Sequence, residues 1–279
     1  MGRAYEVRKA SIQKTGAAKA KLYSMYAREI YQAARNGGVE FEGNPTLKRL
    51  VEKAKKEQVP NDIINRAIDK VNSGADETYT SANYEIFGPA GSTAIVSCLT
   101  DNVNRSVSSV RAVINKCHVK MGNQGSVSYM YDHLCLVIFK GLSEEEALDA
   151  LLEASVDVVD IETDNDEVVV YGEPNDLNNI KEAIMTKLPN VSFDLDEISM
   201  FPKEKVTLTG EDKETFERML SLLDEVEDVQ HVYHNVELWG SFFYNNINLV
   251  IIFLNLFIIK MGDENEWKWR VIKLYLSDL

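Results

Sequence analysis

The sequence predicts an α+β fold with an N-terminal three-helix module and two α/β units of ferredoxin-like strand order, one inserted in the other. Two patterns in the 279 residues predict it. Apolar residues recur at helical spacing up to residue 75, and after it they alternate along short strands separated by further helical stretches. A composition of 45% hydrophobic and 27% charged residues excludes a chain that is disordered throughout.

A basic helical domain is expected over residues 1–76. Its first helix runs from about residue 17 to residue 35 and stops at glycines. The second begins at Asn44-Pro45, where Asn caps the helix and Pro takes the first helical position. The third covers about residues 60–74 and also ends at a glycine.

An α+β domain is expected over residues 77–132 plus 205–238. Its predicted elements are strands at 84–87 and 93–99, a helix near 103–114, a strand at 127–131, a helix near 216–223 and a strand at 229–233. Gly88-Pro89-Ala90-Gly91, between the first two strands, has the residues of a turn. Because the last helix and strand are separated from the others, the stretch between them is expected to be an insertion.

Residues 133–204 are expected to form that inserted domain, a ferredoxin-like α+β unit. Its predicted elements are a strand at 134–139, a helix from Ser143, strands at 156–161 and 167–171, a helix at 174–188 and a strand at 191–198. Glu146 stands three residues after Ser143, which is the spacing of a capping box. The order β-α-β-β-α-β is that of a split βαβ unit.

Residues 239–279 form an atypical hydrophobic C-terminal extension. The extension holds all three Trp of the chain and no Ala, and its residues 242–259 are apolar except for four Asn. Three interpretations stay open: a membrane anchor, a helix that is buried or covered by a partner, and an appended tail without function. The four amides disfavour the membrane, because each would need hydrogen bonds inside hydrocarbon.

The net charge of −14 conceals two opposite regions. Residues 1–75 carry 15 Lys and Arg against 8 Asp and Glu, whereas residues 76–279 carry 15 against 36. A basic arm on an acidic body indicates a polyanion partner, with the acidic body facing away from it or towards a protein. A solvated basic face without a partner is the alternative. The candidate phosphate contacts are Arg3, Arg8, Lys9, Lys14, Lys19, Lys21, Arg28, Lys48, Arg49 and Arg105.

The motifs of common catalytic and metal sites are missing from the sequence. It has no phosphate-binding P-loop, no G-x-S-x-G, no C-x-x-C and no H-E-x-x-H. His231 and His234 would point to opposite faces of a strand, which disfavours joint ligation. We therefore expect a non-enzymatic protein without a catalytic residue, cofactor, metal or small-molecule substrate. Three Cys and the missing secretory signal favour a cytoplasmic location.

The segment from Thr100 to Arg105 joins a strand to the start of a helix. Backbone N–H groups at such a start can bind an anion, which is the first interpretation. Capping by Asp101 or Asn102, with Arg105 paired to nearby acids, is an equally supported second one.

Four separated motifs resemble the YebC family over residues 1 to about 238. They are Tyr84-Glu85-x-Phe87-Gly88-Pro89-x-Gly91, Leu99-Thr100-Asp101-Asn102-Val103-Asn104-Arg105, Met121-Gly122-x-x-Gly125-Ser126-Val127-Ser128-Tyr129-Met130 and Asp228-Val229-Gln230-His231-Val232-Tyr233-His234-Asn235. Their loop residues Gly88, Pro89, Gly91, Asn102, Asn104, Gly122, Gly125 and Ser126 are further site candidates. Ile86 and Ala90 stand where many members have Gly.

The resemblance implies a three-domain α+β protein whose third domain is inserted in the second. It also implies a cytoplasmic, DNA-binding, probable transcriptional regulator, while some members are translation factors that associate with ribosomes and relieve stalling. The leading hypothesis is thus a nucleic-acid-binding regulator of gene expression. The alternative is a ribosome-associated translation factor that binds ribosomal RNA or tRNA, and an acidic protein-interaction scaffold is a third class.

Overall fold

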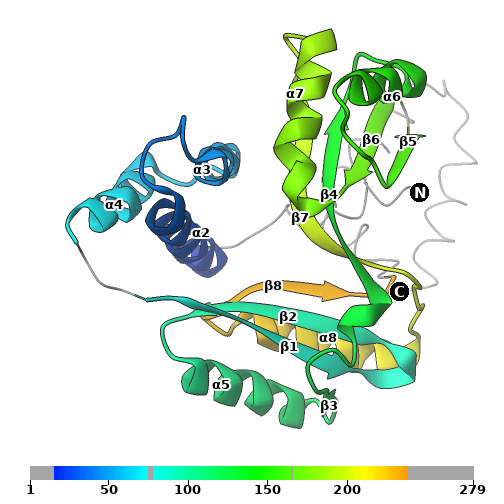
Figure 1. Cartoon of the computed structure of the whole chain (residues 1–279). Helices are drawn as coiled ribbons and strands as arrows, with labels where there is room; N and C mark the ends of the chain where they lie inside the picture. Colours follow the sequence, from blue (N-terminus) through cyan, green and yellow to red (C-terminus); the bar gives the residue numbers. More distant parts are fainter. Residues whose placement is uncertain (1–15, 75–77, 165, 238–279) are drawn as a thin grey trace, which may run out of the picture. The chain divides into compact units, whose positions relative to one another are not determined.

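A computed structural model describes residues 16–74, 78–164 and 166–237 and shows an α+β fold (Figure 1). The predictions for Arg3, Arg8, Lys9, Lys14 and the C-terminal extension lie outside these residues. The helices are α2 (Gly16–Gly37), α3 (Pro45–Lys56), α4 (Asn61–Asn72), α5 (Val103–Lys116), α6 (Glu144–Glu153), α7 (Leu177–Lys187) and α8 (Gly210–Asp224). The strands are β1 (Thr80–Phe87), β2 (Thr93–Thr100), β3 (Lys120–Met121), β4 (Tyr131–Phe139), β5 (Asp160–Asp164), β6 (Glu167–Gly172), β7 (Phe193–Pro202) and β8 (Val229–His234).

The helical module is α2, α3 and α4, packed around apolar side chains that include Tyr26, Ile30 and Leu47. Asn44 caps α3 as predicted, because its Oδ1 accepts the N–H of Leu47 at 3.0 Å. The side-chain amide of Asn44 also donates to the carbonyls of Ala33 and Gly38 at 2.8 Å. One buried amide therefore starts α3 and ties it to the end of α2.

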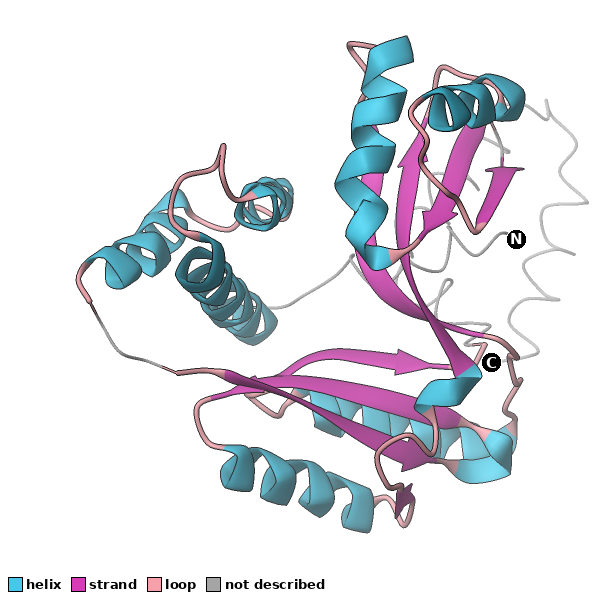
Figure 2. Cartoon of the chain, viewed as in Figure 1, coloured by secondary structure: helices cyan, strands magenta, loops and turns pink. Residues whose placement is uncertain are grey.

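The domain that receives the insertion, which we call the outer unit, is built on one sheet, the outer sheet. Its strand order is β3-β1-β2-β8, and all neighbouring strands are antiparallel. Helices α5 and α8 cover one of its faces (Figure 2). The hairpin strands β1 and β2 occupy its centre. The unit is α+β as predicted, but its strand order is not the ferredoxin-like order that the sequence led us to expect. The chain leaves the unit after β3 and returns with α8 and β8, which confirms the predicted insertion.

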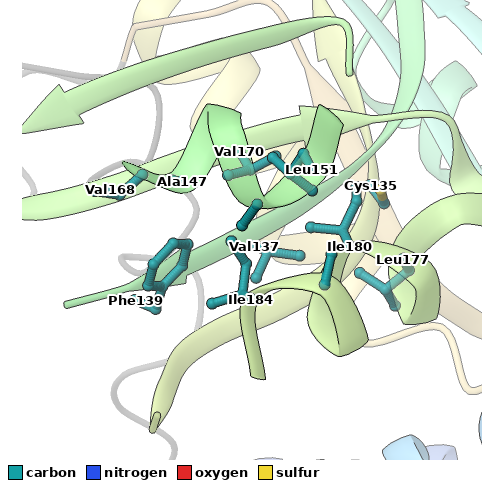
Figure 3. Packing of buried hydrophobic residues seen from close by; sticks show 12 residues of the cluster. Cys135, Val137, Phe139, Ala147, Leu151, Val168, Val170, Leu177, Ile180 and Ile184 are labelled. Atoms are coloured by element: carbon teal, nitrogen blue, oxygen red, sulfur yellow. The ribbon is translucent and has the colours of Figure 1, made fainter. Parts of the chain in front are cut away.

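The inserted sheet has the order β5-β6-β4-β7, which is the ferredoxin-like order predicted for it. Helices α6 and α7 pack on one face, over the strand residues Val137, Phe139 and Val170 (Figure 3). The capping box at the start of α6 is confirmed. The Ser143 N–H donates to the Glu146 carboxylate at 2.8 Å, and the Glu146 N–H donates to the Ser143 hydroxyl at 3.2 Å.

The predicted strand at 127–131 is wrong. Residues Ser128–Met130 form the 3-10 turn η2, and only β3 pairs with β1 on that side. The reason is electrostatic: the Glu85 carboxylate accepts the N–H groups of Val127 and Ser128, which a strand would use in its ladder. Tyr131 instead begins β4 of the inserted sheet, three residues earlier than predicted.

The predicted strand at 156–161 begins later, at Asp160. Ser155 has a φ of 55°, and the N–H of Val156 donates to the carbonyl of Leu151, so the end of α6 continues into a closing turn. Residues 174–176 form the 3-10 turn η3 before α7 rather than the first turn of that helix. Among the described helices, none is long and apolar enough to cross a membrane.

Candidate nucleic-acid interface

The glycine-containing motifs meet at one end of the outer sheet. Strand β1 ends at Phe87, which faces Thr93 of β2 on one side and Lys120 of β3 on the other. The turn η1 (Pro89–Gly91) and the loop 122–128 therefore both leave the sheet at this end. We call these two segments, together with their flanking residues and the turn η2, the loop cluster, which is residues 88–92 and 122–130.

The carboxylate of Glu85 holds the second loop of this cluster. Only 5% of Glu85 is exposed, and its oxygens accept the N–H groups of Gly125 at 2.7 Å, Val127, and Ser128 at 3.2 Å. Burial raises the pKa of the Glu85 carboxyl, but these hydrogen bonds outweigh it and hold the pKa below its ordinary value of 4.5. The loop therefore uses its amides on the chain's own anion and is not an empty cradle for phosphate.

Asn235, from the last of the four motifs, holds the turn η1. Its Oδ1 accepts the N–H of Thr93 at 2.7 Å, and its Nδ2 donates to the carbonyl of Gly91 at 3.3 Å. The buried Tyr131 hydroxyl donates to the Thr93 carbonyl at 3.0 Å, and burial raises the pKa of Tyr131 to about 12. Buried polar side chains thus hold both loops of the cluster, Glu85 the loop 122–128 and Asn235 the turn η1.

Ala90 in this turn has φ 49° and ψ 41°, in the left-handed region that favours glycine. We expect Ala90→Gly to raise the free energy of unfolding by about 0.5 kcal/mol, because relief of strain exceeds the added entropy of the unfolded chain. Denaturant unfolding measures the change. Ala90→Val, which adds a β-branched side chain at this exposed position, should lower the same quantity. A lower value for the Gly variant would contradict the strain argument.

The Asn102–Arg105 motif lies at the opposite end of the outer sheet, with Asp228. The two ends are roughly 25 Å apart for strands of eight residues. Arg105 donates from Nη2 to Asp228 at 2.9 Å and to Asp101 at 2.6 Å. The hydrogen bond with Asp228, and then that with Asp101, raises the pKa of Arg105.

The side chain of Asn102 accepts the N–H of Arg105 at 3.1 Å and so caps α5. The structure therefore matches the second interpretation of this segment, capping with local pairing. Asn104 is exposed on the first turn of the helix.

Several basic candidates contact acidic side chains of the outer unit. Lys21 lies 3.2 Å from Asp224, and Arg28 lies 2.5 Å from Glu227 and 3.5 Å from Asp228. Only 10% of the Arg28 side chain is exposed. The charges of Lys21 and Arg28, like that of Arg105, are thus largely compensated within the chain.

The other basic candidates that the structure describes lie on the surface of the helical module. Lys19 and Lys48 are exposed and Arg49 is half-buried, and the exposed Lys55 lies seven residues after Lys48 on the same side of α3. The remaining lysines of α3 differ, because Lys53 and Lys56 contact β7. We call Lys19, Lys48, Arg49 and Lys55 the open basic surface.

The histidines and cysteines have ordinary structural surroundings. His231 lies 3.3 Å from Glu29, whereas His234 packs edge-on against Phe216, so the two imidazoles are on opposite faces of β8 as expected. Burial raises the pKa of the Cys135 thiol to about 11, which makes it a poor nucleophile. Within the described ranges, no group of three or more side chains could hold a metal ion.

Two residues were missed as site candidates: Glu85 of β1, which holds the loop cluster, and Tyr129 within the cluster. Glu85 has a signal in the sequence, since it is a carboxylate inside an apolar strand next to glycine-rich loops. Tyr129 has none, because the pattern Val127–Tyr131 is equally typical of a strand. Its side chain is 64% exposed.

Two family models together match nearly all of the residues that the structure describes. The family model described as TACO1/YebC protein N-terminal domain matches residues 3–74, and the model described as TACO1/YebC second and third domain matches residues 79–236. A "Probable transcriptional regulatory protein" of Marinobacter nauticus is 45% identical over 238 residues, which are 85% of this chain and 99% of the relative. One of Vibrio campbellii is 46% identical over 85% of this chain and its own full length.

A solved structure is also similar. The crystal structure of a conserved hypothetical protein, Aq1575, from Aquifex aeolicus has a TM-score of 0.65 and 33% sequence identity. The match covers 80% of this chain and 92% of that one.

Proposed function

The chain belongs to the TACO1/YebC family, and from this premise we propose that it is a non-enzymatic, cytoplasmic, nucleic-acid-binding regulator of gene expression. Its relatives are named probable transcriptional regulatory proteins. The observation that carries the proposal is the separation of charge between its domains. The inserted stretch 133–204 holds four Lys and no Arg against 18 Asp and Glu, whereas residues 1–75 have an excess of basic side chains.

Phosphates would be repelled by the inserted unit and attracted to the helical module. The open basic surface supplies cations that are not already paired across the outer unit, and the candidates Arg3, Arg8, Lys9 and Lys14 extend the proposal to the N-terminal arm. Contacts of this kind give affinity and a strong dependence on salt but little base specificity. Lys21, Arg28 and Arg105 then serve to hold α2 and α5 against the segment around Asp228.

A ribosome-associated translation factor would use the same basic surface. Ribosomal RNA and duplex DNA both present a high density of phosphates. Ribosomal RNA also has unpaired bases, and duplex DNA does not. The exposed ring of Tyr129 favours this alternative, because an aromatic side chain can stack only on a base that is accessible. Both polymers therefore belong in the test.

The double variant Lys48→Glu/Lys55→Glu should weaken binding to nucleic acid at least tenfold at low salt. Each lost phosphate contact should also reduce the slope of log affinity against log salt by about 1. Fluorescence anisotropy with a labelled duplex DNA, in parallel with ribosome co-sedimentation across a salt series, measures both quantities. The same change of net charge is made by Lys140→Glu/Lys187→Glu on the acidic inserted unit, and this control should leave both unchanged.

The outcomes separate the hypotheses. Ribosome association without DNA binding would exclude the transcriptional function and favour the translation factor. If neither polymer binds at low salt, both nucleic-acid functions fail and the acidic scaffold remains. An equal loss in the two double variants would mean that total charge, and not the open basic surface, determines the affinity.

A further inference from the structure

Tyr129 lies at an unusual place for a large aromatic side chain. It is in the middle of the turn η2 (Ser128–Met130), and 64% of it is exposed. The residues on either side of the turn have the opposite character, since Val127 is fully buried and Tyr131 is 5% exposed. Packing of the core therefore does not explain Tyr129.

The backbone that carries Tyr129 is fixed at both ends. Before it, the N–H groups of Val127 and Ser128 donate to the buried carboxylate of Glu85. After it, the N–H of Met130 donates to the carbonyl of Val127 at 2.9 Å, and the Met130 carbonyl accepts the N–H of Lys203 at 2.9 Å. An exposed ring on a rigid support loses little conformational entropy when it binds a flat partner.

Two lysines, Lys120 and Lys203, come from the segments that pair with or pack beside the turn η2 and β1. Lys120 faces Phe87 across β3 and β1 and so shares the face on which Phe87 and Met130 pack. The backbone N–H of Lys203 donates to the Met130 carbonyl, the Lys203 side chain is about half exposed, and its Nζ lies 3.4 Å from Asp132. Gly125 has open space around it, so the loop beside the turn allows a close approach.

We propose that Tyr129 is a stacking platform for one unpaired base of a single-stranded nucleic acid, with the flanking phosphates beside Lys120 and Lys203. The proposal rests on the proposed function and names the form of nucleic acid that the loop cluster takes. Aromatic rings stack on bases of any type, and nearby cations follow the backbone. Inside a duplex both faces of each base are already covered by neighbouring bases, so the ring requires a single strand, a loop or an end.

The test uses the full chain and a single-stranded RNA of twelve nucleotides with one central 2-aminopurine. Stacking on Tyr129 should quench the 2-aminopurine fluorescence. Tyr129→Ala should remove the quenching and weaken binding about tenfold, a typical loss for one stacked base. Tyr129→Phe keeps the ring and should bind within twofold of the unchanged protein, whereas Tyr129→Leu should behave like the Ala variant.

Leu152→Ala is the matched control, because Leu152 is also 64% exposed but lies on α6 of the acidic unit. It should change nothing, and the melting temperatures of all four variants should stay the same. Normal binding and quenching by Tyr129→Ala would overturn the stacking proposal. So would an equal loss of single-stranded and duplex affinity, or normal RNA affinity with weakened ribosome binding, which would point to a protein contact. If the unchanged protein binds no nucleic acid, the proposed function itself fails.

Discussion

Replacing Asp228 with Ala is expected to lower the free energy of unfolding by about 3 kcal/mol, a loss of about 6–12 °C in melting temperature. Only 4% of the Asp228 side chain is exposed, and Arg105 donates to it from Nη2 at 2.9 Å and from Nε at 3.3 Å. Arg28 adds a second cation at 3.5 Å. Removing one partner leaves the remaining charges poorly compensated, which costs more than the pair contributes. Differential scanning calorimetry measures the shift.

Asp224→Ala is the matched control for this prediction. Asp224 is the last residue of α8, four residues before Asp228, and pairs with Lys21 at 3.2 Å, but its side chain is 64% exposed. An exposed pair contributes less than about 1 kcal/mol, so its melting temperature should fall by at most a few degrees. Asp228→Asn should lie near the Ala variant, because it lacks the charge. Equal effects of the Asp224 and Asp228 variants would mean that burial of Asp228 has no energetic importance.

Local signals predicted much of the fold. Asn44 before Pro45 and the pair Ser143 and Glu146 are caps whose partners lie three residues away, and both helices begin where these residues place them. The inserted sheet follows from the order of its elements, since the split βαβ arrangement allows few alternatives. The strand order of the outer sheet was harder to predict, because the same pattern of elements is compatible with a hairpin at the centre or at the edge of the sheet.

The site depends more on contacts between distant residues. Arg105 and Asp228 are 123 residues apart, and Lys21 and Asp224 are 203 apart. Charge counting treats all four as surface groups, so it included Lys21 and Arg105 among the phosphate contacts. The strand predicted at 127–131 failed for a similar reason, because its amides bind a carboxylate from β1 rather than a neighbouring strand. The alternation of apolar residues carries no information about a distant carboxylate that competes for the same amides.

Glu85→Ala is expected to lower the free energy of unfolding by about 2–4 kcal/mol, because it leaves buried amides without an acceptor. Val127 is fully buried, so water cannot easily replace the lost hydrogen bond at its N–H. The loop 122–130 should loosen, and amide hydrogen exchange of Gly125, Val127 and Ser128 should quicken while exchange in β2 changes little. Unchanged protection of the loop amides in the variant would show that something other than Glu85 holds the loop.

The same carboxylate gives a dependence on pH whose sign follows from its lowered pKa. Because the pKa of Glu85 in the folded protein lies below its ordinary value of 4.5, its contribution is fully present above that value and is lost as the pH falls below it. The difference in unfolding free energy between the unchanged protein and Glu85→Gln, measured with urea, should thus be constant from pH 7 to about 5 and shrink in more acid solution. The comparison with Gln cancels other carboxyls with lowered pKa, such as Glu146. A difference that grows on acidification would require a raised pKa, and with it a Glu85 that holds the loop as a neutral acid.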